Sequence, residues 1–202
     1  MTDEEKLISQ AIWIAHSLFE RNKVTGSAAN LSFKLNGVVY ITASGSCFGT
    51  LSQEDFSATG LNGQLLKGRE PSKELPLHQI LYGKDSSIQA IVHTHSFYSV
   101  LWSMEDFGNE ADCVPEYTPY LRMRLGTVGL VDYAKPGSNE LFDAFRKVLN
   151  LSDGYILKNH GPIIGGKTLM DAFYNLEELE ESCKMAWHVK HYCGIQSQTK
   201  QP

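Results

Sequence analysis

The amino-acid sequence predicts a layered domain of the α/β or α+β class. Amphipathic helical patterns stand near both ends of the chain, the first opening at Thr2 and the last at Thr168. Between them, short strand-like runs alternate with further helical patterns, and one pair of runs flanks the hairpin dipeptide Asn36-Gly37. Helices and strands that alternate in this way bury their apolar sides against one another in layers, which favours this class.

The N-terminal elements follow from capping and turn signals. Thr2 and Glu5 form a capping box that opens the first helix. Its predicted apolar face consists of Ile8, Ala11, Ile12, Ala15, Leu18 and Phe19. The runs LSFKL (31–35) and VVYIT (38–42) are predicted to form a hairpin around Asn36-Gly37, and the small residues 43–46 form a loop after it.

The rest of the chain alternates helices with short strands. Helices are predicted over 75–82, 96–104, 140–149 and 168–192, and strands over 88–92, 127–133, 154–157 and 163–166. The apolar stripe of the longest helix is Leu169, Ala172, Phe173, Leu176, Leu179, Cys183 and Ala186. Because no repeat, low-complexity tract or linker interrupts the pattern, we predict a single domain over residues 1–202.

Composition excludes several classes of protein. Hydrophobic residues make up 42% and charged residues 20%, which is typical of a globular protein and not of a disordered one. A formal charge of −5 without a run of Lys and Arg argues against a nucleic-acid partner. No apolar stretch approaches the ~18 residues of a membrane span. Four scattered cysteines and an acidic start without a secretory signal lead us to expect a cytoplasmic protein.

Three histidines are candidates for a metal site. His93 and His95 follow the predicted strand 88–92, and side chains two residues apart on a strand point to the same face. His160 lies in a polar turn after another short strand. Three imidazoles with an open position form a common catalytic zinc site, although a surface or core pair of histidines would show the same spacing.

Glu74 has two interpretations. It stands at the start of a predicted helix, where Ser72 fits an N-cap and a first-turn carboxylate is favoured by the helix dipole. Glu74 also fits a metal neighbour or a proton shuttle. The sequence pattern leaves both interpretations open, and it predicts that His78 is a core or hydrogen-bonded histidine.

Five short blocks in order make nearly the whole chain resemble the class II aldolase/adducin family. They are TGSAANLS (25–32), ITASG (41–45), PSKE (71–74), VHTHS (92–96) and KNHG (158–161). The resemblance implies a three-layer αβα fold with a central, mostly antiparallel sheet flanked by helices. It also implies a homotetramer with sites near the subunit interfaces.

The resemblance assigns roles to particular residues. The implied ligands of one divalent metal per subunit, expected to be Zn²⁺, are His93, His95, His160 and, when substrate is absent, Glu74. Glu74 is also the implied acid/base residue. The residues implied to bind the substrate phosphate are Asn30, Ser44, Gly45, Ser72 and Lys73.

Lys73 departs from the aldolases of the family, which carry a second phosphate-binding serine there. A cation at a helix start is disfavoured by ~0.3–1 kcal/mol, so an anionic ligand explains Lys73 better than a solvated surface does. Further blocks, at 71–78, 118–126 and 177–181, resemble the subgroup of 3-oxo-tetronate 4-phosphate decarboxylases. A substrate with both phosphate and carboxylate groups suits this extra charge.

The resemblance thus implies a lyase that decarboxylates 3-oxo-tetronate 4-phosphate to dihydroxyacetone phosphate and CO₂, through an enediolate held at the metal. The alternative is a sugar-phosphate aldolase of the fuculose-1-phosphate type, in which Tyr120 of a neighbouring subunit would serve as the acid. A ribulose-phosphate 4-epimerase ranks third. A non-catalytic adducin-like interaction module is a remote alternative, because the chain retains Glu74 and all three histidines.

Overall fold

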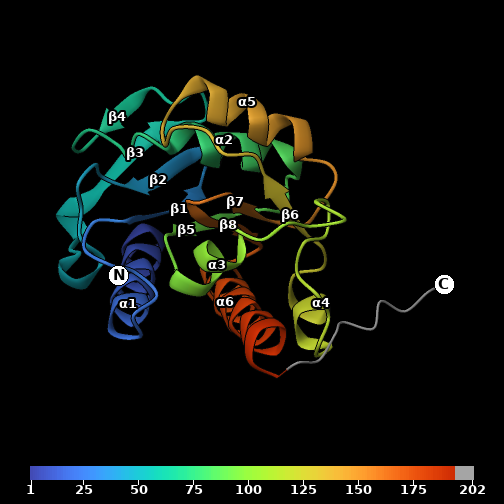
Figure 1. Cartoon of the computed structure of the whole chain (residues 1–202). Coiled ribbons are helices and arrows are strands. Elements are labelled where there is room, and N and C mark those ends of the chain that lie inside the picture. Colours follow the sequence, from blue (N-terminus) through green and yellow to red (C-terminus); the bar gives the residue numbers. More distant parts are fainter. Residues whose placement is uncertain (194–202) are drawn as a thin grey trace.

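One eight-stranded sheet runs through the protein, in the order β4-β3-β2-β1-β5-β8-β7-β6 (Figure 1). The computed structural model describes residues 1–193. All neighbouring strands are antiparallel except β6 and β7, which are parallel. The strands are β1 Ala29–Leu35, β2 Val38–Thr42, β3 Phe56–Gly60, β4 Leu65–Lys67, β5 Ala90–Thr94, β6 Val128–Val131, β7 Gly154–Leu157 and β8 Gly161–Gly166.

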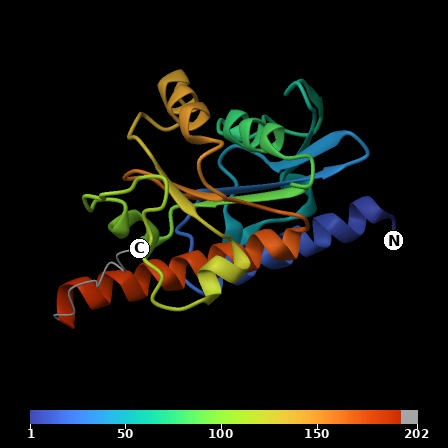
Figure 2. The same ribbon diagram turned by 90° about the vertical axis from the view of Figure 1, so that its right-hand side faces the viewer.

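Helices cover both faces of the sheet, which confirms the predicted αβα layers. The helices are α1 Asp3–Glu20, α2 Leu75–Lys84, α3 Phe97–Trp102, α4 Tyr120–Arg124, α5 Asn139–Val148 and α6 Leu169–Tyr192. Helices α2 and α5 lie on one face, and α1 and α6 lie on the other, with α3 and α4 packed against α6 (Figure 2). Each face has its own apolar core. Within residues 1–193, no helix combines the length and the apolar character needed to cross a membrane.

Side-chain alternation in the central strands places polar groups on the α2 face. In β1, Leu31 and Phe33 join the core beneath α1 and α6. The alternate residues Asn30 and Ser32 therefore face α2. The register of the antiparallel pair sets Asn30 directly opposite His93 of β5. The sheet thus brings these polar side chains together beside the start of α2.

The local signals of the sequence predicted most elements. Thr2 and Glu5 form the capping box, and the hairpin pairs Leu35 with Val38 around Asn36 and Gly37, which both have positive φ. The structure adds β3, β4, α4 and two short 3₁₀ turns that the sequence did not predict. These segments are three to five residues long, too short to show a clear period. Strand β5 also continues beyond the predicted end, because its pairing with β1 extends to Thr94.

The predicted core of the two long helices is largely confirmed, with one error in α1. All seven residues of the predicted α6 stripe are buried. In α1, Ile14 is fully buried although it was not predicted, whereas Phe19 is 37% exposed. The Phe19 ring lies over Gly49, where a Cβ atom would approach it to 2.6 Å. Phe19 therefore packs on a neighbouring loop at the helix end and not in the core.

Candidate active site

Glu74, His93, His95 and His160 converge in one cluster, and their ligand atoms all lie within 4.8 Å of one another. Three parts of the fold supply them: Glu74 directly precedes α2, His93 lies near the end of β5 with His95 just after it, and His160 lies in the turn between β7 and β8. The fold therefore brings together the four side chains that the sequence named as metal ligands.

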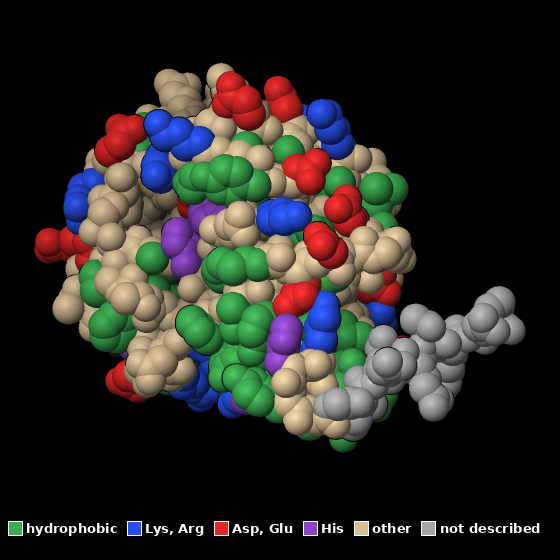
Figure 3. Space-filling view, in the orientation of Figure 1, with side chains coloured by type: hydrophobic (Ala, Val, Ile, Leu, Met, Phe, Trp, Pro, Cys, Tyr) green, Lys and Arg blue, Asp and Glu red, His purple; other side chains and the backbone are tan. Residues whose placement is uncertain are grey.

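The cluster is tight and open on one side. His93 Nε2 lies 3.3 Å from His160 Nε2 and 3.3 Å from Glu74 Oε2. His160 Nε2 lies 3.2 Å from Glu74 Oε1. Of the four side chains only that of His95 is exposed. Histidine side chains accordingly show at the surface in a hollow of the face drawn in Figure 3, with Lys or Arg side chains nearby.

The donor set fits a divalent cation. His93 Nδ1 donates to the Pro162 carbonyl over 2.8 Å, so that Nε2 turns its lone pair toward the cluster. Glu74 Oε1 is buried without a hydrogen-bond partner among the described residues. Burial, followed by the charges of His93 and His160, lowers the pKa of His95 to about 3, which keeps this imidazole neutral. Neutral imidazoles and a carboxylate suit zinc, manganese, cobalt or iron.

Glu74 is held as a carboxylate. Burial by itself would raise its pKa, but the charge of His93 and the close contacts with His160 and His93 outweigh burial and hold the pKa well below its usual range. Asn30 Nδ2 donates a further hydrogen bond to Glu74 Oε2 over 2.9 Å. An ionised carboxylate in this position can contact a cation or accept a proton.

The start of α2 differs from the prediction that Ser72 caps it. The helix begins at Leu75, and Glu74 occupies the N-cap position without capping it through its side chain. Ser72 Oγ instead accepts a hydrogen bond from the Glu74 N–H over 3.3 Å. The Glu74 carboxylate is therefore free to turn to the histidines, which favours the functional interpretation of this residue.

The turn that carries His160 depends on a glycine. The His160 N–H donates to the Leu157 carbonyl over 3.0 Å, and Asn159 has a φ of 57°. Gly161 has a φ of 141°, and a Cβ atom there would lie 2.1 Å from the Thr94 carbonyl oxygen. Only glycine lets β8 start this close to the end of β5.

We expect Gly161→Ala to lower the free energy of unfolding by at least about 2 kcal/mol, because the methyl group meets backbone and the φ is strained. Urea denaturation measures this change, and metal content shows whether His160 is displaced. The control is Gly83→Ala in α2, where a Cβ atom meets nothing within 4 Å and alanine favours the helix. A Gly161→Ala variant as stable as the wild type would contradict the assignment.

Glu180 holds the chain immediately after His95. Its buried carboxylate accepts hydrogen bonds from the Tyr98 N–H at 2.9 Å, the Ser99 N–H at 2.8 Å and Ser99 Oγ at 2.6 Å. These groups belong to the first turn of α3, where backbone N–H groups have no partner within the helix. Helix α6 thereby fixes the direction in which the chain leaves His95.

Four of the five predicted phosphate-binding residues lie on two neighbouring loops, whereas Asn30 lies in β1 and its amide contacts Glu74 and His78. The Ser44 N–H donates to the Glu70 carbonyl over 2.9 Å, and the Ser72 N–H donates to the Thr42 carbonyl over 3.2 Å. Gly45 has a φ of 76° and open space where a side chain would stand. The loops after β2 and before α2 are thus tied side by side, next to Glu74.

Lys73 lies at the open side of the cluster. Its side chain is exposed, and its stem packs against the turn at Gly137. Burial is the main cause of the lowered pKa of His95 and of His160, and the charge of Lys73 adds to both shifts. The Lys73 ammonium group therefore lies near these two histidines. Within the described part of the chain no carboxylate forms an ion pair with Lys73, so its charge is available to an anion.

The Asn30 amide nitrogen contacts the Glu74 carboxylate, and the amide oxygen contacts a histidine. Asn30 Oδ1 lies 2.6 Å from His78 Nε2, and His78 is fully buried, as predicted. Two further residues were not predicted: Ser32, which contacts His78, and Tyr82, which contacts Ser32. Two signals point to them: Ser32 alternates with apolar residues in β1, and Tyr82 lies four residues after His78 on α2.

Tyr120 lies apart from the cluster of its own chain. It is 59% exposed and lines a cavity with Lys84 and Gly166. Gly166 is at the end of β8 opposite to the metal-binding end, where Gly161 stands. Tyr120 therefore reaches a metal cluster only if that cluster belongs to another copy of the protein.

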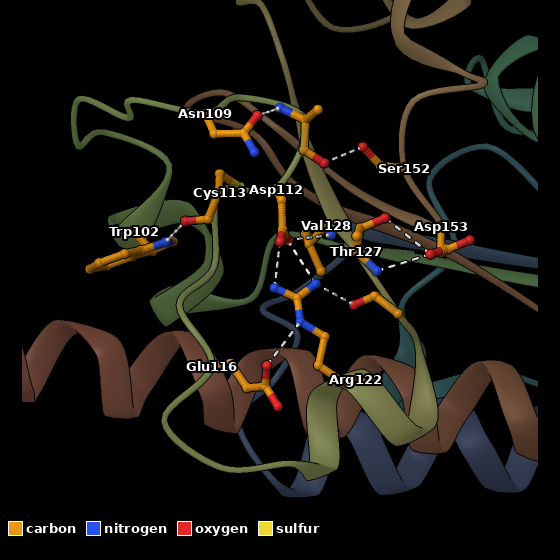
Figure 4. A network of polar contacts seen from close by, with 12 residues as sticks. Trp102, Asn109, Asp112, Cys113, Glu116, Arg122, Thr127, Val128, Ser152 and Asp153 are labelled. Carbon is orange, nitrogen blue, oxygen red and sulfur yellow. Dashed lines mark hydrogen bonds and ion pairs between the residues drawn. The ribbon is translucent and has the colours of Figure 1, made fainter. Parts of the chain in front are cut away.

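A polar network anchors the segment that carries Tyr120 (Figure 4). Arg122 of α4 pairs with both carboxylate oxygens of Asp112 and donates to the Gly126 carbonyl over 3.1 Å. Asp112 in turn accepts the Val128 N–H of β6 over 3.2 Å. Helix α4 is consequently tied through Asp112 to the edge strand β6.

Comparison with known proteins places this chain in one family. The chain belongs to the family described as class II aldolase and adducin N-terminal domain, whose model matches residues 9–187. A 3-oxo-tetronate 4-phosphate decarboxylase of Pectobacterium atrosepticum is 37% identical over 92% of this chain and 85% of its own length. An L-fuculose phosphate aldolase of Methanocaldococcus jannaschii is 38% identical over 87% of this chain and 93% of its own length.

A solved structure agrees with the sequence relatives. YgbL of Klebsiella pneumoniae, for which aldolase, epimerase and decarboxylase activities have been suggested, superposes with a TM-score of 0.89 at 34% identity. The alignment covers 95% of this chain and 93% of YgbL. The central, mostly antiparallel sheet flanked by helices is thus the fold of this family.

Proposed function

We propose that this protein is a metal-dependent carbon–carbon lyase that decarboxylates 3-oxo-tetronate 4-phosphate to dihydroxyacetone phosphate and CO₂. The observation that carries the proposal is the convergence of Glu74 with three histidines in a chain of this family. Four curated relatives at 36–37% identity are named 3-oxo-tetronate 4-phosphate decarboxylases, which supports the choice of substrate.

Each part of the cluster has a role in this reaction. His93, His95 and His160 would hold a divalent metal, which supplies Lewis-acid stabilisation of the negative charge that develops on the 3-oxo group. The substrate is a β-keto acid, so the electron pair of the breaking bond passes toward that group as CO₂ leaves. The Glu74 carboxylate then orients a water, or relays a proton taken from one, so that this proton reaches the carbon that lost CO₂ and the hydroxide left behind passes to solvent. This protonation completes dihydroxyacetone phosphate.

The loops beside the cluster provide the anion sites. Ser44 and Ser72 would offer their hydroxyl groups, and Gly45 its backbone N–H group, to the substrate phosphate. Lys73 adds a charge that has no carboxylate partner among residues 1–193. We assign Lys73 to the second anionic group of the substrate, the carboxylate.

The metal, the assembly and the compartment complete the proposal. Zn²⁺ suits three imidazoles with an open position. We also propose a cytoplasmic homotetramer with sites near the subunit interfaces. The position of Tyr120 supports this assembly, because its side chain is exposed on an anchored helix and lies apart from the cluster of its own chain. The single domain over residues 1–202 belongs to the same proposal.

A fuculose-phosphate aldolase is the second candidate, because the 38% identity to the Methanocaldococcus jannaschii aldolase is close to the 37% identity to the Pectobacterium atrosepticum decarboxylase. Both reactions pass through an enediolate and differ in the group that leaves. An aldolase has to protonate a departing alkoxide, for which Tyr120 of a neighbouring subunit would be the acid. An epimerase would also need re-addition to the opposite face of the carbonyl and ranks third.

Two substrates separate these activities. Metal-loaded protein is incubated with 3-oxo-tetronate 4-phosphate, with CO₂ and dihydroxyacetone phosphate measured, and separately with fuculose 1-phosphate, with aldehyde measured. We expect CO₂ release from the first substrate. Aldehyde from the second without CO₂ from the first would contradict the decarboxylase proposal and favour the aldolase.

The Lys73→Ser variant tests the carboxylate assignment. A charge-assisted hydrogen bond contributes about 1.5–3 kcal/mol, so kcat/KM for decarboxylation is expected to fall about 10- to 100-fold. Because Lys73 is exposed, the free energy of unfolding should change by no more than about 0.5 kcal/mol. Lys67→Ser, at an exposed lysine of β4, is the matched control. An unchanged kcat/KM in Lys73→Ser would contradict the carboxylate assignment and indicate that Lys73 is a solvated surface residue.

A further inference from the structure

Five buried polar side chains form a continuous row from α2 to the candidate metal centre. The Tyr82 hydroxyl lies 2.8 Å from Ser32 Oγ, which lies 2.7 Å from His78 Nδ1. His78 Nε2 lies 2.6 Å from Asn30 Oδ1, and Asn30 Nδ2 lies 2.9 Å from Glu74 Oε2. Each of these residues is at most 9% exposed. The reaction proposed above does not use Ser32, His78 or Tyr82.

The chemistry of Glu74 sets the direction of every hydrogen bond in the row. An ionised carboxylate only accepts, so the NH₂ group of Asn30 has to face Glu74 and its carbonyl oxygen has to face His78. That oxygen also only accepts, and His78 Nε2 must therefore carry a proton. In the neutral ring Nδ1 then accepts from the Ser32 hydroxyl, which accepts from Tyr82.

The surroundings of His78 favour the neutral ring. Burial, followed by the charge of His93, lowers the pKa of His78 to about 3, although Glu74 opposes the shift. A neutral ring with the proton on Nε2 gives every donor in the row one acceptor. The row is therefore satisfied from end to end.

We propose that His78 is a positioning residue of the metal centre, which acts by holding the Asn30 amide in the orientation that donates to Glu74. The oxygen and nitrogen of an amide have nearly the same shape, so packing alone does not choose between the two orientations. A flipped amide would set its carbonyl oxygen against the Glu74 carboxylate. The Nε2–H group of His78 prevents this, since it accepts no hydrogen bond from an NH₂ group.

The orientation of the Asn30 amide in turn affects the orientation of the Glu74 carboxylate. Asn30 holds Oε2, while Oε1 has no hydrogen-bond partner among the described residues and stands 3.2 Å from His160 Nε2. The orientation of Glu74 relative to the histidines thus depends on a residue that touches neither metal ligands nor substrate. This inference rests on the proposed metal centre and does not depend on which bond of the substrate breaks.

The experiment compares Zn²⁺ affinity, by competition with a chelator, in the wild type, His78→Leu and His78→Gln. Changes behind a metal ligand commonly weaken metal binding or activity about 10- to 100-fold, and we expect a loss in this range for His78→Leu. Glutamine keeps an N–H donor for Asn30 and should recover most of the loss. The matched control is His16→Leu, because His16 lies on α1 and bonds to the Leu51 carbonyl, outside the row.

Two further measurements keep the inference testable. In an Asn30→Ala background, His78→Leu should weaken Zn²⁺ binding by less than twofold more, because His78 acts through Asn30. Nitrogen NMR of the wild type should show the proton of His78 on Nε2, and this measurement needs no variant. Wild-type Zn²⁺ affinity in His78→Leu, an undiminished effect in the Asn30→Ala background, or a proton on Nδ1 would each overturn the inference.

These readouts separate the inference from the proposed reaction. Zn²⁺ affinity and the position of the His78 proton require no substrate. Failure to release CO₂ from 3-oxo-tetronate 4-phosphate, with Zn²⁺ bound as expected in every variant, would therefore contradict the reaction and leave the role of His78 supported.

Discussion

His93→Ala is expected to lower kcat at least about 100-fold, the usual effect of removing one electrostatic stabiliser of a transition state. His93 is fully buried, and its Nε2 stands between His160 and Glu74, 3.3 Å from each. No other described side chain can take its place there without rearranging β5. Metal content, measured by elemental analysis, should fall together with kcat.

The controls for His93 test the metal itself. Chelation of the wild-type protein should remove activity, and added Zn²⁺ should restore it, whereas neither treatment should raise the activity of His93→Ala. His191→Ala is the matched variant, since His191 is exposed on α6 and bonds to Glu105. Full turnover by a metal-free His93→Ala protein would rule out the mechanism.

Glu74→Gln is expected to lower kcat by about 10²–10⁴-fold while the protein keeps its metal, because a positioned acid/base contributes in this range. Glutamine has nearly the same shape as glutamate but can neither accept nor return a proton. The three histidines remain in place to hold the cation. Kinetics and metal content, measured on the same preparation, distinguish this result from loss of the metal.

Solvent exchange gives an independent test of Glu74. If Glu74 protonates carbon, then the metal-loaded wild type should catalyse deuterium incorporation into dihydroxyacetone phosphate in D₂O, by the reverse of that step. Glu74→Gln should lose this exchange. Glu74→Asp keeps the charge on a shorter side chain and should retain part of it. Wild-type exchange in Glu74→Gln would assign the proton transfer to another group.

Local patterns in the sequence determined the elements whose signals lie within a few residues. The capping box at Thr2, the Asn36-Gly37 turn and the α6 stripe all rest on spacings of two to four residues, and the structure has each of them. The pairing of His93 with His95 belongs to the same kind of signal, since strand alternation is local. His160 and Glu74 were candidates from their residue types and local setting, but only the resemblance to a family assigned them to the same site as His93 and His95.

Tertiary structure decided what depends on residues far apart in the chain. The register of β1 against β5 sets Asn30 opposite His93, and the close approach of Thr94 requires glycine at position 161. The tertiary structure also places Tyr120 away from the cluster of its own chain. Spacing along a strand shows which face a side chain occupies but not which strand lies beside it.

The predicted layered domain and the two histidines at a strand end therefore follow from the periodicity of the sequence alone. The metal centre needed the sheet, because Glu74, His93 and His160 come from segments 19 to 86 residues apart. The row of hydrogen bonds through His78 required, in addition, that donors and acceptors be assigned. Its direction follows from which groups can donate and which can only accept, and these groups meet only when β1 and α2 pack together.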